Sequence, residues 1–121
     1  MKFLVSWTSA PGDREEGYKC FAQMSDADHA ADHAGVTIIG RWHNLGQGSG
    51  LAICESDDAA AVHAWAFNWN KILDIDVAPV LDDDEARAVV KARRADRKGT
   101  ELLKNAEPPQ PRVSAAMPVT R

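Results

Sequence analysis

All eight aromatic residues of this 121-residue chain lie between Phe3 and Trp69. Aromatic rings contribute much of the apolar area that a small domain buries, about 150–250 Å² for each ring. The chain after Trp69 has no such rings, so it cannot form a substantial core of its own. The chain also has the length of one domain. We therefore predict a single folded body that spans residues 1–84.

The charges divide at the same point. Residues 1–84 contain 5 Lys/Arg and 14 Asp/Glu, whereas residues 85–121 contain 9 Lys/Arg and 4 Asp/Glu. The basic segment predicts an appended helix over residues 85–104. Three prolines within four positions, Pro108, Pro109 and Pro111, predict that residues 105–121 form a proline-rich disordered tail.

Composition excludes several classes of protein. No run approaches the roughly 18–20 apolar residues of a membrane span, and the first residues lack the pattern of a secretion signal. Two cysteines, Cys20 and Cys54, make no disulfide framework. We therefore expect a cytoplasmic protein without a membrane segment.

Hydrophobic periodicity predicts the elements of the body. Alternating apolar and polar residues indicate strands, and apolar residues spaced three and four apart indicate helices. Asp13 and Glu16 have the spacing of a capping box, and we expect the helix after them to bury Tyr18 and Phe21. The predicted strands cover residues 2–8, 36–43, 51–55 and 72–80, and the predicted helices cover residues 14–24 and 59–70.

The order strand–helix–strand–strand–helix–strand predicts an α+β fold of the ferredoxin-like type, with an antiparallel sheet and an extra C-terminal helix. Both main helices of such a fold cover one face of the sheet. The other face needs a cover, and a second copy of the same sheet provides one. We therefore expect a homodimer.

Several segments together resemble a small, uncharacterised bacterial domain family of the dimeric α+β-barrel superfamily. The most specific of these segments is the Arg-Trp-His strand motif within Gly40-Arg41-Trp42-His43. The others are Met1–Trp7, Glu55, Trp65–Trp69 and Val77–Leu81. The resemblance implies two ferredoxin-like sheets paired into a barrel, with a pocket between each sheet and its helices. That superfamily includes cofactor-free monooxygenases, haem-degrading enzymes, isomerases, dehydratases and ligand sensors, so the resemblance implies a cavity rather than a reaction.

His43 is the candidate catalytic residue. It ends a predicted strand before the glycine-rich segment Asn44–Gly50, where a pocket mouth is expected. An imidazole titrates near neutral pH and serves as a proton acceptor or donor. The alternative is a histidine that only anchors the hairpin loop.

Five further residues are candidates for the ligand pocket. Arg41 shares a strand face with His43, and its guanidinium suits an anionic group. Trp42 stands between them in the sequence, so its side chain points to the opposite face of the strand. Glu55 closes the next strand and is a candidate neighbour of His43, or an acidic residue at the start of the following helix. Trp65 and Trp69 share one helix face, as core residues or as the wall of an apolar pocket.

His29 and His33 have the i, i+4 spacing of zinc ligands, but a third ligand is missing from the pattern. We therefore predict neither a metal site nor a cofactor. The loop Gly46–Gly50 joins two strands and so differs from a dinucleotide-binding loop, which leads into a helix.

Two functions remain open at this point. The first is a small-molecule-binding protein, and if it is an enzyme, a cofactor-free one that uses His43. The second is a non-catalytic dimeric scaffold or regulatory protein whose residues 85–121 bind a protein partner. Nucleic acid is an improbable partner, because no aromatic residue is interleaved with the basic ones.

Overall fold

The computed structural model describes residues 1–104, with side chains to residue 97. The chain divides after Asp82 into two compact units. The first unit contains the sheet and its helices. The described part of the second is one helix, α4 (Asp83–Lys104). The predicted tail, residues 105–121, lies outside the described residues.

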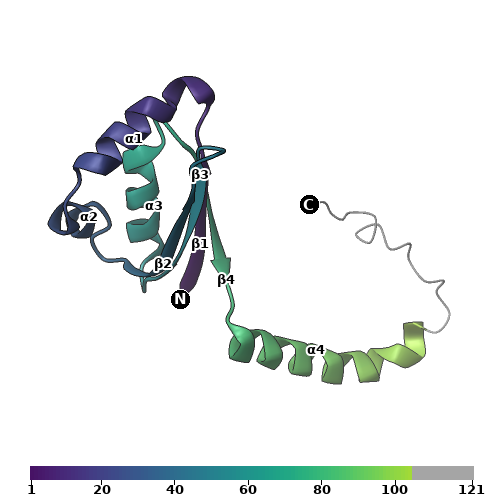
Figure 1. Ribbon diagram of the computed structural model, residues 1–121. Coiled ribbons are helices and arrows are strands. Elements are labelled where there is room, and N and C mark those ends of the chain that lie inside the picture. Colours follow the sequence, from purple (N-terminus) through teal and green to yellow (C-terminus); the bar gives the residue numbers. More distant parts are fainter. Residues whose placement is uncertain (105–121) are drawn as a thin grey trace. The chain divides into compact units, whose positions relative to one another are not determined.

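The helices of the first unit lie on one side of the sheet (Figure 1). The strands are β1 (Lys2–Thr8), β2 (Thr37–Asn44), β3 (Ser49–Glu55) and β4 (Asp74–Val80). The helices are a short 3₁₀ turn η1 (Pro11–Asp13), α1 (Arg14–Gln23), α2 (Asp26–Asp32) and α3 (Ala59–Trp69). The strands and the two main helices of this unit have the predicted order, and a short helix that was not predicted, α2, follows α1.

The four strands form one antiparallel sheet in the order β2-β3-β1-β4. Strand β1 lies inside the sheet, and Val5 on it pairs with Ala52 of β3 and Val77 of β4. This order confirms the predicted ferredoxin-like α+β fold, and α4 is the extra C-terminal helix.

The core lies where α3 crosses the sheet. Phe3, Ala52 and Cys54 point toward this helix and pack with Val62 and Trp65, which are 0% and 6% exposed. Alternate residues of a strand point to opposite faces, so one face of β1 and β3 supplies this core. Asp58 caps α3 by accepting a hydrogen bond from the Ala60 amide at 2.9 Å.

The predicted capping box at the start of α1 is wrong. Asp13 makes no side-chain cap hydrogen bond, because the chain enters α1 from the preceding turn η1 with Asp13 already in a helical conformation. The capping box instead begins α2. The Ser25 hydroxyl accepts from the Asp28 amide, and the Asp28 carboxylate accepts from the Ser25 amide.

The expectation that α1 buries Tyr18 and Phe21 is also wrong. These side chains are 37% and 40% exposed, and α1 contains no buried residue. Both line a cavity between α1 and the sheet, which leaves each side chain partly open.

The second face of the sheet is covered by no element of residues 1–82 and carries large apolar side chains. Leu51, Ile39 and Trp42 are 39%, 54% and 58% exposed. The Trp42 indole lies over Gly40, where a Cβ atom would collide with the ring. This uncovered apolar face is formed mainly by β2 and β3.

We expect Val62→Ala to lower the free energy of unfolding of the first unit by about 2–3 kcal/mol, since two buried carbons are lost and a small void remains. The matched control is Val90→Ala on α4, where the side chain is 52% exposed. The control should change stability by less than about 0.5 kcal/mol. Urea unfolding followed by tryptophan fluorescence measures both, and equal effects would refute this account of the core.

Candidate functional site

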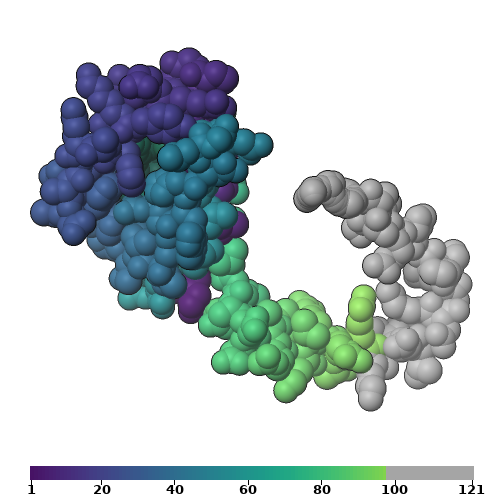
Figure 2. Space-filling model, viewed as in Figure 1, coloured from purple at the N-terminus to yellow at the C-terminus, as the bar shows by residue number. Residues whose placement is uncertain are grey.

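A cavity of about 550 Å³ lies between the sheet and helices α1, α2 and α3. A hollow opens on the surface between α1 and the β2–β3 hairpin (Figure 2). The walls are mostly apolar, with the aromatic residues Trp7, Tyr18, Phe21, Trp65 and Trp69. The ionisable side chains among the other lining residues are Arg14, His29, Asp32, Arg41 and His43.

The cavity exists because α1 is attached to the hairpin tip and does not lie flat on the sheet. The Tyr18 hydroxyl donates to the Leu45 carbonyl at 3.1 Å, and Nη2 of Arg14 donates to the Gln47 carbonyl at 3.0 Å. The Ser9 amide and hydroxyl both donate to the Gly48 carbonyl at 2.9 Å. These bonds hold the hairpin tip against the start of α1, and the space behind them stays open.

A glycine near the hairpin end of the inner strand β3 positions two aromatic rings of the cavity. Gly50 pairs with Trp7 on one side and with His43 on the other. A Cβ atom at Gly50 would collide with the Trp7 indole. Because that atom is missing, the indole lies across Gly50 and meets the His43 ring edge-on, with 5.7 Å between ring centroids.

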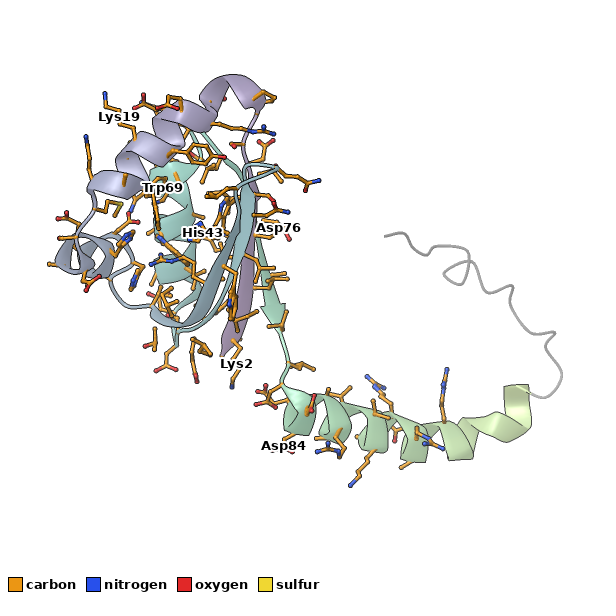
Figure 3. The ribbon with its side chains drawn as sticks, in the orientation of Figure 1. Lys2, Lys19, His43, Trp69, Asp76 and Asp84 are labelled. Carbon is orange, nitrogen blue, oxygen red and sulfur yellow. The ribbon has the colours of Figure 1, made fainter. Side chains whose placement is uncertain are left out.

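His43 projects from β2 toward the helices and lines the cavity between them and the sheet (Figure 3). Its ring also packs against Phe21 of α1, with centroids 4.8 Å apart. Partial burial, then the Arg41 guanidinium, then His29 hold the pKa of His43 below its ordinary value. The imidazole is therefore mainly neutral at pH 7, which is the form that accepts a proton.

Arg41 and His29 complete the polar part of the cavity near His43. Arg41 pairs with Ala52 on the same sheet face as His43. The His29 ring of α2 also packs against the Phe21 ring, with centroids 5.2 Å apart. Its Nδ1 atom is buried and has no hydrogen-bond partner in the described part of the chain.

Asp32 fixes the two tryptophans that line the cavity from α3. One carboxylate oxygen accepts from the indole nitrogens of Trp65 and Trp69, at 3.2 and 2.7 Å, and the other accepts from the Asn68 amide at 2.9 Å. This carboxylate therefore joins α2 to α3 and orients both rings.

The structure brings four of the six predicted site residues together: Arg41, His43, Trp65 and Trp69 all line the cavity. Trp42 lies on the uncovered apolar face, because alternation along β2 turns it away from His43. Glu55 pairs with Thr37, at the far end of the hairpin from the His43–Gly50 pair. The register therefore excludes one of the two alternatives for Glu55, a neighbour of His43.

Sequence reasoning missed Trp7 and Asp32 as site residues. Trp7 lies on the same face of β1 as Phe3 and Val5, so periodicity predicts a core position, and only the pairing with Gly50 places it in the cavity. Asp32 lies in a segment whose structure the sequence left uncertain. Its one available signal is the capping box at Ser25 and Asp28, which predicts a helix there.

His29 and His33 have separate surroundings. His33 lies within hydrogen-bond distance of the Val36 carbonyl at 3.0 Å and packs on Trp65, whereas His29 faces the cavity. Within residues 1–104, no group of three or more His, Cys, Asp or Glu side chains is arranged to hold a metal ion.

The residues that line the cavity all belong to the first unit, and helix α4 is described by itself. Its described side chains include exposed Val89 and Val90, 51% and 52% accessible, beside several arginines. Binding of a protein partner by residues 85–121 stays a prediction. None of the helices in the described chain has the length and apolar character needed to cross a membrane.

Comparisons with known proteins were made for the whole chain. The model of a family described as "Domain of unknown function (DUF3303)" matches residues 1–94. A search of curated proteins found no match. Among solved structures, the chain is similar to a Deinococcus radiodurans protein provisionally assigned as an antibiotic biosynthesis monooxygenase. The identity is 12% and the TM-score 0.41, over 68% of this chain and 94% of that one.

The electrostatics of the cavity predict the titration of His43. We expect its ring to titrate below the ordinary histidine value of 6.5, and we expect Arg41→Gln to move the pKa upward because a nearby cation is removed. Lys71→Gln, which removes an exposed cation outside the cavity, should leave the pKa unchanged. Two-dimensional NMR of the ring protons against pH measures all three, and a pKa at or above 6.5 in the wild type would refute the assignment.

The lowered pKa of His43 should also make the free energy of unfolding depend on pH. Because the folded protein binds a proton at His43 less readily than the unfolded chain does, stability is lost as pH falls below about 6.5 and through the folded-state pKa. This loss should be smaller in His43→Gln, as measured by urea unfolding at several pH values. A loss of equal size in both proteins would exclude His43 as the group responsible.

Proposed function

The chain belongs to the DUF3303 family, and we propose that it binds a small planar organic molecule in the cavity between its sheet and helices. The observation that carries this proposal is the cavity itself, at about 550 Å³. Ligand pockets commonly measure about 300–1,000 Å³ and combine apolar walls with a few polar groups. The aromatic walls offer flat surfaces on which a ring can stack.

His43 supplies the reactive group in this proposal. No hydrogen-bond partner for its ring nitrogens is found among the described residues, so the neutral imidazole is available to a ligand. A bound molecule with an acidic O–H or C–H group would pass that proton to the imidazole. The electron pair stays on the molecule as an anion, and the Arg41 guanidinium on the same strand face stabilises that charge. This chemistry needs no cofactor.

We also propose that the uncovered apolar face pairs with that of a second copy, as the resemblance to dimeric α+β barrels implies. The face presents Ile39, Trp42 and Leu51 to solvent, and contiguous apolar surface of this kind marks an interaction site. A two-fold dimer is self-complementary, so one copy can cover the same face of the other.

Filling the cavity tests the binding proposal. Gly17 lines the cavity from α1, and a Cβ atom there would meet only Ile72, at an ordinary 3.7 Å. We expect Gly17→Leu to weaken binding of 2-naphthamide, a neutral planar probe, by about tenfold or more, while helix propensity keeps the variant folded. Quenching of tryptophan fluorescence measures the affinity.

The matched control is Ala22→Leu, which adds bulk on an exposed position of the same helix. It should bind 2-naphthamide as the wild type does. Absence of binding to the wild type, or equal binding to both variants, would overturn the proposed pocket. Native mass spectrometry of freshly purified protein identifies any molecule that the cavity retains.

A charge on the uncovered face tests the dimer. We expect the wild type to sediment as a dimer and Trp42→Glu to sediment as a monomer, because a dimer would bury the introduced carboxylate without a partner. The matched control is Phe67→Glu, at a side chain 73% exposed on α3. It should remain dimeric. A monomeric wild type at tens of micromolar would refute this proposal.

A further inference from the structure

We propose that the cavity selects planar molecules that carry a carboxylate or a similar delocalised anion, with the anion beside Arg41, His43 and His29. The inference rests on the proposed function and adds the charge of the ligand. Two observations support it. The first is the set of charged side chains that line the cavity, and the second is a pair of buried polar atoms, on lining residues, that lack hydrogen-bond partners in the described chain.

The charge of the cavity is opposite to that of the unit around it. Residues 1–82 contain 12 Asp/Glu and only 5 Lys/Arg, yet two of those five cations, Arg14 and Arg41, line the cavity. Asp32 is the one carboxylate among the lining residues. Its oxygens already accept three hydrogen bonds, from two indoles and the Asn68 amide.

Among the described residues, no carboxylate forms an ion pair with either arginine of the cavity. Ion pairs between described residues involve other side chains, and Arg14 donates only to the Gln47 carbonyl. An uncompensated guanidinium in a partly enclosed apolar site favours an anion, with a geometry that matches a carboxylate.

Two buried polar atoms point independently to a ligand. Nδ1 of His29 and Nε of Arg14 are both buried without a hydrogen-bond partner in the described chain, and both residues line this cavity. An unsatisfied buried polar atom costs about 1–3 kcal/mol. A ligand whose oxygen atoms draw these side chains into the cavity would give the Arg14 N–H group an acceptor, and would give one to His29 when Nδ1 carries the proton.

The aromatic contacts indicate how such a ligand lies. The His29 and His43 rings both pack on Phe21, at 5.2 and 4.8 Å between centroids. Trp65 and Trp69 of α3 line the same cavity and are oriented by their hydrogen bonds to Asp32. A planar molecule therefore has the tryptophans as its apolar contact and the two imidazoles with Arg41 at its charged end.

A bound anion also changes the titration of His43. The charged and titratable groups that line the cavity with it are Arg41 of β2, His29 and Asp32 of α2, and Arg14 and Tyr18 of α1. Arg41 and His29 disfavour a proton on His43. A carboxylate beside them offsets that effect, so binding should raise the pKa of His43, and affinity should increase as the pH falls toward it.

The acidic surface does not prevent this selectivity. Charges farther away than about 8 Å are largely screened at physiological salt, so a ligand inside the cavity responds mainly to the groups that line it. The surface carboxylates should lower the association rate at low salt more than they lower the affinity.

The experiment compares 2-naphthoate with 2-naphthamide, two probes of nearly equal shape that differ in charge. We expect 2-naphthoate to bind the full-length wild type about tenfold tighter, by calorimetry at pH 7. Arg41→Gln should remove most of that preference and change 2-naphthamide binding by less than about twofold, which also shows that the variant is folded. Lys71→Gln, which removes an exposed cation outside the cavity, should behave as the wild type.

The outcomes separate the two proposals. If both probes bind equally, or if Arg41→Gln keeps the preference, the inference about charge is overturned and the proposed pocket stands. If neither probe binds, the proposed function itself fails. NMR gives a second readout: 2-naphthoate should raise the pKa of His43 and 2-naphthamide should not, and the same shift with both probes would count against the anion site.

Discussion

The position of β1 between β3 and β4 is the constraint on which the rest of the structure depends. Its pairing with each neighbour sets the register of β1. As a result, Phe3, Val5 and Trp7 point to one face of the sheet along with their partners on β3 and β4. A slip of one residue would turn all three to the other face. Phe3 and Val5 form the core under α3, and Trp7 begins the cavity. Residues of this one strand therefore contribute both to the hydrophobic core and to the lining of the cavity.

The cavity is the part of the helix–sheet interface that the chain does not fill. Hydrogen bonds hold its boundaries in place: α1 is bonded to the hairpin tip through Arg14 and Tyr18, and α2 is bonded to α3 through Asp32. Such bonds fix positions without filling volume. The space between them is the ligand site that we propose, lined by a mainly neutral His43 and by Arg41, which has no ion pair within the described residues.

Local patterns in the sequence were sufficient for the fold. The alternation in β1, the β-branched residues of β2 and the apolar face of α3 each predict their element, and their order predicts the ferredoxin-like sheet. Alternation also predicts that Arg41 and His43 share a face, which the structure confirms, because both facts depend only on neighbours within one strand. The prediction that Tyr18 and Phe21 are core residues failed, since periodicity identifies an inward face but not how much of that face its neighbours cover.

What the sequence by itself determined is which residues form the four strands and the two main helices, and which of those residues lie on the inward face. Only the tertiary structure decided that Glu55 lies far from His43, that Gly50 leaves room for Trp7 beside it, and that Asp32 reaches two indoles more than thirty positions away. The physical reason is the range of the interactions. Periodicity and capping act within a few residues of the chain, whereas strand register and the attachment of helices join segments that are distant in sequence.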